Sequence, residues 1–171
     1  TYGIYPVQSS GVLIERVEAT GIDDAGIYAG QCEDVIVRDS VVYGNVLGIE
    51  LENTVGGEVY NNHAYDNTLG ILIVLLPNLT SKMSTDTLIY DNLIEDNNHV
   101  NFASMGVARV APKGTGMLIL ASDNNVVTGN TFRNNDSVGV AIFSLTRSGT
   151  YEEDQIDVGP LPEGNWIHGN I

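Results

Sequence analysis

The chain of 171 residues is poor in cysteine, in basic residues and in long apolar runs. Cys32 is the only cysteine, so an internal disulfide is excluded. Only seven basic residues stand against 22 acidic ones, and the net charge of −15 repels phosphate backbones. Nucleic acid is therefore not an expected partner. No apolar run is long enough to span a bilayer, so we expect no transmembrane segment.

The two ends of the sequence indicate a piece of a longer protein. It starts at Thr1 without an initiator methionine or a signal segment, and it stops at Ile171 inside what reads as another repeat. The repeat runs through the chain without a linker. We therefore expect residues 1–171 to form a single domain that is a processed or truncated part of a longer chain.

What the sequence does contain is a repeat in which a glycine precedes an alternating apolar strand. Successive repeats begin 22 or 23 residues apart, at Gly3, Gly26, Gly48 and Gly70, and again at Gly116 and Gly139. A fixed period of this length is typical of stacked units that cannot bury their apolar faces alone. The architecture is therefore predictable from the sequence alone.

A second apolar segment follows each glycine by about ten residues. One of its positions is aliphatic in every unit: Ile14, Val37, Val59, Ile89, Val127 and Ile167. Three positions later asparagine recurs, and a second asparagine column follows at Asn45, Asn67, Asn97 and Asn135. Apolar columns predict interior stacks. Asparagine columns predict turn ladders, in which each amide bonds the backbone and the amide of the next unit.

These features predict an all-β fold, a right-handed parallel β-helix of about six coils with three short strands each. No segment keeps a helical period beyond two turns. The 46-residue step from Gly70 to Gly116 holds one coil and two insertions, near 77–84 and 98–115. A third irregular stretch, near 146–163, precedes the last coil. Loops on a rigid scaffold often carry the function of such folds.

Alternation along the first strand of each coil places one set of side chains outside the solenoid. In the first coils this set comprises Tyr5, Tyr28, Glu50 and Glu52. They are candidate ligand-binding residues, because rings can stack on sugars and carboxylates can accept hydroxyl protons. The alternative is two solvent-facing tyrosines beside a solvated acidic pair.

The same outward face becomes apolar in the later coils, at Leu72, Val74, Leu118, Leu120 and Phe143. An apolar patch of this kind is usually covered or bound. We expect the insertions either to fold over it as a lid or to leave it exposed as a partner interface.

No catalytic residue or metal ligand is indicated by a motif. Glu50 and Glu52 share one strand face and do not oppose each other across a bond, as glycosidase carboxylates must. The first strands present no lysine or arginine outward; Arg109, Lys113 and Arg147 all lie in the insertions. The three histidines fall at different points of the repeat and have no metal-ligand spacing. We expect neither a metal nor a cofactor.

Several segments resemble a known family, namely Tyr2-Gly-Ile-Tyr-Pro-Val-Gln8, Asp24-Ala-Gly-Ile-Tyr28, Gly48-Ile-Glu-Leu-Glu-Asn53, Asp96-Asn-Asn-His-Val-Asn-Phe102 and Leu161-Pro-Glu-Gly164. They are similar to an exported bacterial right-handed parallel β-helix family of unknown function, and the likeness covers the whole chain. The resemblance implies an extracytoplasmic location, in the periplasm or at the cell surface, with a signal or lipoprotein peptide. It also implies a second exported protein as a possible partner.

More distantly, the coil pattern is similar to that of pectate lyases, polygalacturonases and alginate epimerases. Their catalytic clusters have no residue-by-residue match here, and fold alone does not give function. Our leading hypothesis is a non-catalytic extracytoplasmic module that binds a glycan or a protein partner along the first-strand face. The alternatives are a carbohydrate-active enzyme (a polysaccharide lyase, epimerase or hydrolase) acting through Arg109, Lys113 or His99, and a passive structural rod of a larger surface protein.

Overall fold

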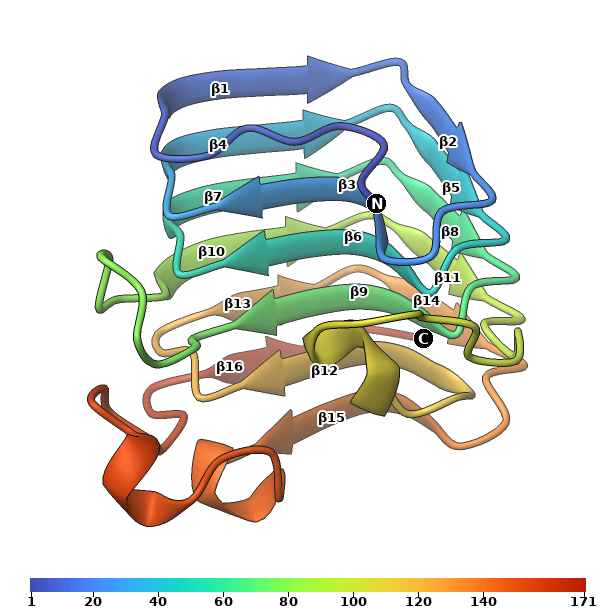
Figure 1. The fold of residues 1–171 in the computed structure, drawn as a ribbon. Coiled ribbons are helices and arrows are strands. Elements are labelled where there is room, and N and C mark those ends of the chain that lie inside the picture. The colour runs from blue at the N-terminus through green and yellow to red at the C-terminus, as the bar shows by residue number, and fades with distance from the viewer.

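A computed structural model describes residues 1–171 and shows the stacked coils of a right-handed parallel β-helix (Figure 1). Sheet A contains β3 (Ala25–Gly30), β6 (Leu47–Glu52), β9 (Leu69–Val74), β12 (Thr115–Leu120) and β15 (Val138–Phe143). Sheet B contains β1 (Ser10–Glu15), β4 (Glu33–Arg38), β7 (Val55–Tyr60), β10 (Thr85–Tyr90), β13 (Val126–Thr128) and β16 (Trp166–His168). Sheet C contains β2 (Glu18–Thr20), β5 (Val41–Tyr43), β8 (His63–Tyr65), β11 (Leu93–Glu95) and β14 (Thr131–Arg133).

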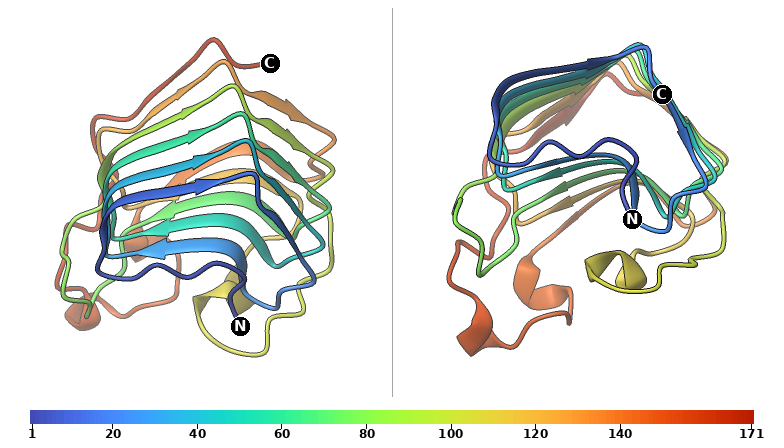
Figure 2. Two further views of the ribbon diagram at one scale, coloured as in Figure 1. Left: turned by 90° about the horizontal axis from the view of Figure 1, so that it is seen from above. Right: turned by 45° about the horizontal axis from the view of Figure 1, so that its top comes forward.

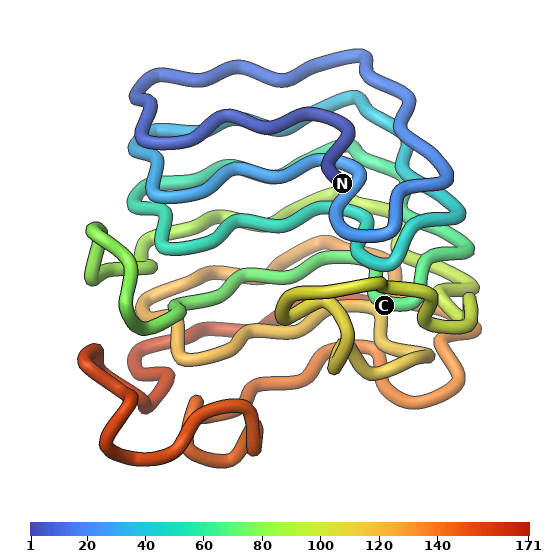
Figure 3. Tube along the Cα trace, in the orientation of Figure 1, coloured from blue at the N-terminus to red at the C-terminus, as the bar shows by residue number.

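Equivalent positions of successive coils lie directly above one another, as the repeat predicts. Ile27 of β3 pairs with Ile49 of β6, which pairs with Ile71 of β9. Every strand pairing is parallel, and the tube trace in Figure 3 shows how closely the coils repeat the same path. The predicted fold class and its vertical columns are confirmed.

The interior of the solenoid is a continuous apolar column. The inward residues of sheet A, such as Ile27, Ile49 and Leu51, are fully buried and pack against Val37 and Val59 of sheet B. One coil alone would leave these side chains half exposed, whereas stacking removes them from water on both sides. Each fully buried aliphatic side chain contributes about 1.5–3 kcal/mol, so the hydrophobic gain grows with every added coil.

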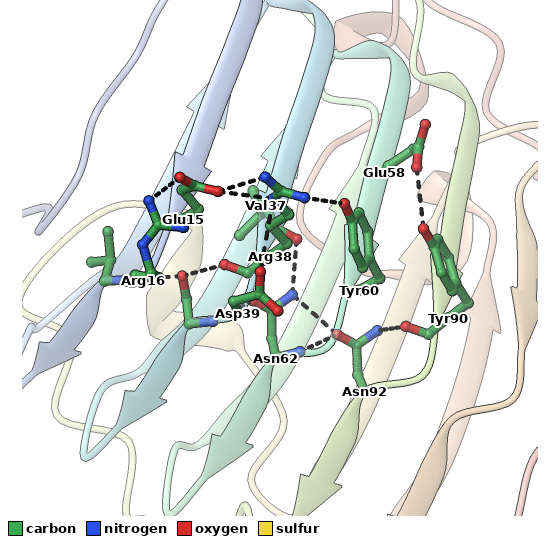
Figure 4. A network of polar contacts seen from close by, with 12 residues as sticks. Glu15, Arg16, Val37, Arg38, Asp39, Glu58, Tyr60, Asn62, Tyr90 and Asn92 are labelled. Carbon is green, nitrogen blue, oxygen red and sulfur yellow. Dashed lines mark hydrogen bonds and ion pairs between the residues drawn. The ribbon is translucent and has the colours of Figure 1, made fainter.

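The predicted asparagine ladders are present at the turns between sheets. Asn62 Nδ2 donates to Asn92 Oδ1 at 3.0 Å, and the backbone N–H of Asn62 donates to the same oxygen (Figure 4). Asn45 Nδ2 likewise donates to Asn67 Oδ1 at 3.0 Å in the second ladder. The residue before each ladder asparagine has a positive φ, as at Asp91 with 52°. Short polar residues and glycine tolerate that conformation, which explains the composition of the turns.

The repeated glycine of sheet A is required by the close approach of adjacent coils. A Cβ on Gly48 would lie 2.4 Å from the carbonyl oxygen of Gly70, and one on Gly70 would lie 2.6 Å from that of Gly116. Gly3 and Gly116 stand in the same relation to the glycine of the next coil. The glycine column is therefore a packing constraint between neighbouring backbones.

Three insertions interrupt the coils, between β9 and β10, between β11 and β12, and between β15 and β16. The second contains the 3-10 helix η1 (Val107–Val110), and the third contains η2 (Leu145–Arg147) and η3 (Glu153–Gln155). Figure 2 shows the second and third lying over the outer face of sheet A. There Leu72, Val74 and Leu120 are buried with Ala108 and Leu145 in a second apolar cluster. The lid prediction is thus confirmed for Leu72, Val74 and Leu120, whereas Phe143 of the same patch is 50% exposed.

None of the helices is both long enough and apolar enough to cross a membrane.

Candidate functional site

Three tyrosines stack on one another at the N-terminal end of the outer face of sheet A. The ring centroids of Tyr2 and Tyr5 are 4.4 Å apart, and those of Tyr5 and Tyr28 are 4.8 Å apart. Tyr2 also lies 4.6 Å from Tyr28, so each ring contacts the other two. Residues before β1 form this corner, where Ile4 bridges to Ile27. Such a stack offers flat apolar faces edged by hydroxyl groups.

Carboxyl groups lie directly beside these rings. The hydroxyl of Tyr28 donates to Glu52 Oε1 at 2.7 Å, and Glu50 is the register partner of Tyr28 on the next strand. Asp24 lies immediately before β3, and its charge contributes to the raised pKa of Tyr2. We call Tyr2, Tyr5, Tyr28, Asp24, Glu50 and Glu52 the tyrosine–carboxylate cluster.

Burial dominates the electrostatics of the cluster. Glu50 is only 4% exposed, and its carboxyl makes no hydrogen bond with any protein group. Desolvation raises the pKa of Glu50 well above its ordinary value, and the charges of Glu52 and Asp24 raise it further. The pKa of Glu52 is also raised by burial, although the hydrogen bond from Tyr28 opposes that rise. Burial and the nearby carboxylates raise the pKa of both Tyr2 and Tyr28.

The insertions reach the cluster from different sides. In the second insertion, Ser104 Oγ donates to Asp23 Oδ2 at 2.9 Å. In the first, the backbone N–H of Thr80 donates to Gln31 Oε1 at 2.9 Å, just after β3. Burial and the charge of Glu52 raise the pKa of Tyr151 in the third insertion. The first and second insertions therefore contact residues that flank β3, next to the cluster.

The structure brings the four candidate residues of the sequence together on one face. Tyr5 is 54% exposed, but Tyr28 is only 4% exposed and Glu50 is equally buried. The open platform of four surface residues is therefore replaced by one exposed ring above two buried groups. The alternative of a solvated acidic pair is wrong for Glu50 for the same reason.

Two members of the cluster, Tyr2 and Asp24, and the nearby Tyr151 are not among the candidate residues of the sequence. Tyr2 lies outside the alternation that places Tyr5, and Asp24 belongs to a turn. Tyr151 comes from an insertion whose path has no repeat to predict it. Of these three residues, only Tyr2 could have been identified from the sequence, because it stands three residues before Tyr5 in an otherwise apolar segment.

The loop residues assigned to the enzyme hypothesis do not converge on the cluster. Arg109 and Lys113 are exposed and form no ion pair or side-chain hydrogen bond with Glu50 or Glu52. His99 Nδ1 instead lies 3.4 Å from Asp66 Oδ1. No group of three or more histidine, cysteine or acidic side chains is arranged to hold a metal ion.

Tyrosine stacking also occurs on the other two outer faces. Tyr60 and Tyr90 stack at 4.7 Å on sheet B, and Tyr43 and Tyr65 stack at 5.0 Å on sheet C. On sheet B the hydroxyl of Tyr60 accepts from Arg38, which also donates to Glu15 (Figure 4). Stacked rings alone are therefore a property of the repeat. The buried, unpartnered Glu50 is what distinguishes the cluster on sheet A.

The fold and these columns define the class of protein as a right-handed parallel β-helix. Residues 1–156 match the family model described as right handed beta helix region, and the chain belongs to that family. No curated protein matches it.

Solved structures with the same fold act on polysaccharides. The A-module of the Azotobacter vinelandii mannuronan C-5 epimerase AlgE4 is 20% identical, with a TM-score of 0.61 over 99% of this chain and 50% of that one. The AlgE6 A-module of the same organism is 21% identical, with a TM-score of 0.55 over 94% of this chain and 41% of that one. An alginate lyase from Paenibacillus sp. str. FPU-7 is 13% identical, with a TM-score of 0.52 over 98% and 59%. The chain thus spans about half the length of these structures, and the likeness shows the fold alone.

Proposed function

We propose that this protein is an extracytoplasmic, non-catalytic module that binds a glycan at the tyrosine–carboxylate cluster. The observation that carries the proposal is the exposed ring of Tyr5, stacked on two further tyrosines above carboxyl groups. A sugar ring can lie on such a face while its hydroxyls donate to Glu52 and Asp24. Structural neighbours that act on polysaccharides support this choice of ligand class.

Charge limits which glycan fits. Asp24, Glu50 and Glu52 lie together without a basic side chain among them, in a chain of net charge −15. A polyuronate would bring further carboxylates to this point and be repelled. We therefore expect neutral oligosaccharides or amino sugars as ligands, in contrast to the mannuronan and alginate named for the structural neighbours.

The test is binding of neutral, amino and uronate oligosaccharides, measured by calorimetry after a glycan array. Tyr5→Ala should weaken binding roughly twofold to tenfold, because an aromatic stacking contact contributes about 0.5–1.5 kcal/mol. Tyr65→Ala removes an equivalent ring from sheet C and should leave affinity unchanged. Equal affinity of the wild type and Tyr5→Ala, or loss of affinity in both variants, would show that the cluster is not the glycan site.

One observation favours a second candidate, a carbohydrate-active enzyme. Glu50 and Glu52 differ in environment, and burial raises the pKa of Glu50 more strongly. A carboxyl with a raised pKa can give its proton to a glycosidic oxygen as the bond to the leaving sugar breaks, while water adds to the anomeric carbon of the other sugar. Reducing ends released from neutral polysaccharides by the wild type, and not by Glu50→Gln, would establish this activity in place of simple binding.

A further inference from the structure

A separate apolar cavity of about 340 Å³ lies further along the outer face of sheet A. Its floor includes Leu72 and Leu118, which belong to the same outward column as Glu50. The second insertion covers it from one side with Val110, and the third borders it with Arg147. The volume is at the low end of the range of about 300–1,000 Å³ for small-molecule sites, so the cavity suits a small ligand and not a polymer.

The cavity opens to solvent through an apolar rim. Val110 is 60% exposed and Phe143 is 50% exposed, and both line the opening. Behind this rim the lining is mainly apolar, with Leu47, Leu69 and Leu72 among the lining residues. The interior of the cavity therefore favours an apolar chain, and any charged part of a ligand would lie at the opening.

The positive charges of the protein gather at the same opening. Four of the seven basic residues form ion pairs with acidic neighbours: Arg16, Arg38, Lys82 and Arg133. The remaining three, Arg109, Lys113 and Arg147, have no carboxylate partner, although acidic residues outnumber basic ones threefold. Arg147 lines the cavity, and the other two adjoin lining residues of the second insertion. Among acidic residues, Asp136 adjoins the lining residue Ser137 in the same way, so three basic residues and one acidic residue lie at or beside the lining.

We propose that this cavity binds a single-chain amphiphile with an anionic head group. The alkyl chain lies between the leucines of sheet A and η1, where burial of apolar surface drives binding. The head group lies at the opening beside Arg147, whose guanidinium can bond a carboxylate or a phosphate in two places. The proposal goes beyond glycan binding, because it concerns another site and another ligand class.

Calorimetric titration of the protein with laurate, below its micelle concentration, tests the proposal. Lauryl phosphate distinguishes a phosphate head from a carboxylate head, and dodecyltrimethylammonium carries a similar chain with the opposite charge. We expect saturable binding of one or both anions and binding of the cation at least about tenfold weaker. No saturable binding of either anion, or equal affinity for the cation, would overturn the proposal.

Variants separate the head group from the chain. Arg147→Gln, at an exposed residue, should weaken anion binding about tenfold, whereas Arg16→Gln, at the residue just after β1, should leave it unchanged. Ala141→Phe fills the cavity from β15 and should abolish binding of the chain. Circular dichroism and the thermal midpoint verify folding of each variant. Unchanged affinity in Arg147→Gln, or an equal loss in Arg16→Gln, contradicts the proposal even if Ala141→Phe does not fold.

Discussion

At the scale of single residues, Glu50 shows how burial on the outer face of a sheet raises the pKa of a carboxyl group. It points out of sheet A and would be solvated on a bare solenoid. Cover by the N-terminal residues and the loops leaves it 4% exposed and without a hydrogen bond. Its ionised form is therefore destabilised, and this cost belongs to the folded state alone.

Replacing Glu50 by glutamine should change how stability depends on pH. The pKa of Glu50 is raised on folding, so below its ordinary value of 4.5 the group is protonated in both states and costs nothing. As pH rises above that value, the unfolded chain releases the proton and folding becomes less favourable, until pH passes the folded pKa. At neutral pH Glu50→Gln should therefore be more stable relative to the wild type than it is in acid, as measured by urea unfolding across this pH range.

The matched control for this prediction is Glu33→Gln, at an exposed position of β4. Its difference from the wild type should stay near zero across the same pH range. A constant difference between Glu50→Gln and the wild type from acid to neutral pH would show that Glu50 does not titrate differently on folding.

The residues of the cluster also show that the sequence predicts which face a side chain takes but not how exposed it is. Alternation places Tyr28 and Glu50 outside the sheet correctly, because the strand period fixes which face a side chain takes. It does not say what lies above that face. Tyr2 and insertion residues pack against the second apolar cluster on that face, and their positions follow no repeat. The predicted site residues are therefore neighbours, yet their exposure differs from expectation.

At the scale of elements, the glycine column ties each coil to the next. The carbonyl oxygen of one glycine fills the space where a Cβ of the preceding glycine would stand. Strand spacing of about 4.8 Å leaves no room to relieve such a contact along the stack. The period of the repeat was therefore visible in the sequence because glycine is required once in every coil.

Gly48→Ala should destabilise the protein by about 1–3 kcal/mol or more, since the new Cβ would lie 2.4 Å from the carbonyl oxygen of Gly70. The midpoint of thermal unfolding should then fall by roughly 2–4 °C for each kcal/mol of stability lost. Gly159→Ala is the control, because nothing lies within 4 Å of its added Cβ. Equal midpoints for the two variants would show that neighbouring coils can shift apart at little cost.

The coils and their ladders were predictable from sequence at this scale, whereas the insertions were predictable only in position. Columns such as Ile27, Ile49 and Ile71 follow from one period applied repeatedly. The path of η1 over sheet A depends instead on apolar contacts such as that of Ala108 with the second cluster. Such contacts form between residues far apart in sequence, and no local pattern encodes them.

At the scale of the whole molecule, charge is unevenly distributed. The acidic surplus covers the solenoid, while the three unpaired basic residues stand around one opening in the lid. Five side-chain ion pairs, made by four lysine and arginine residues, neutralise only a small part of the surplus. Mutual repulsion among the remaining carboxylates therefore acts against the compact state.

Added salt should stabilise this protein. Raising sodium chloride from a few millimolar to about 0.15 M shortens the screening length to about 8 Å, which weakens repulsion between surface carboxylates on neighbouring coils. The few exposed ion pairs lose strength as well, but each is worth at most about 1 kcal/mol. We expect the thermal midpoint at pH 7 to rise by a few degrees, and potassium chloride should act alike because screening depends on ionic strength. A falling midpoint would mean that the ion pairs outweigh the repulsion among the carboxylates.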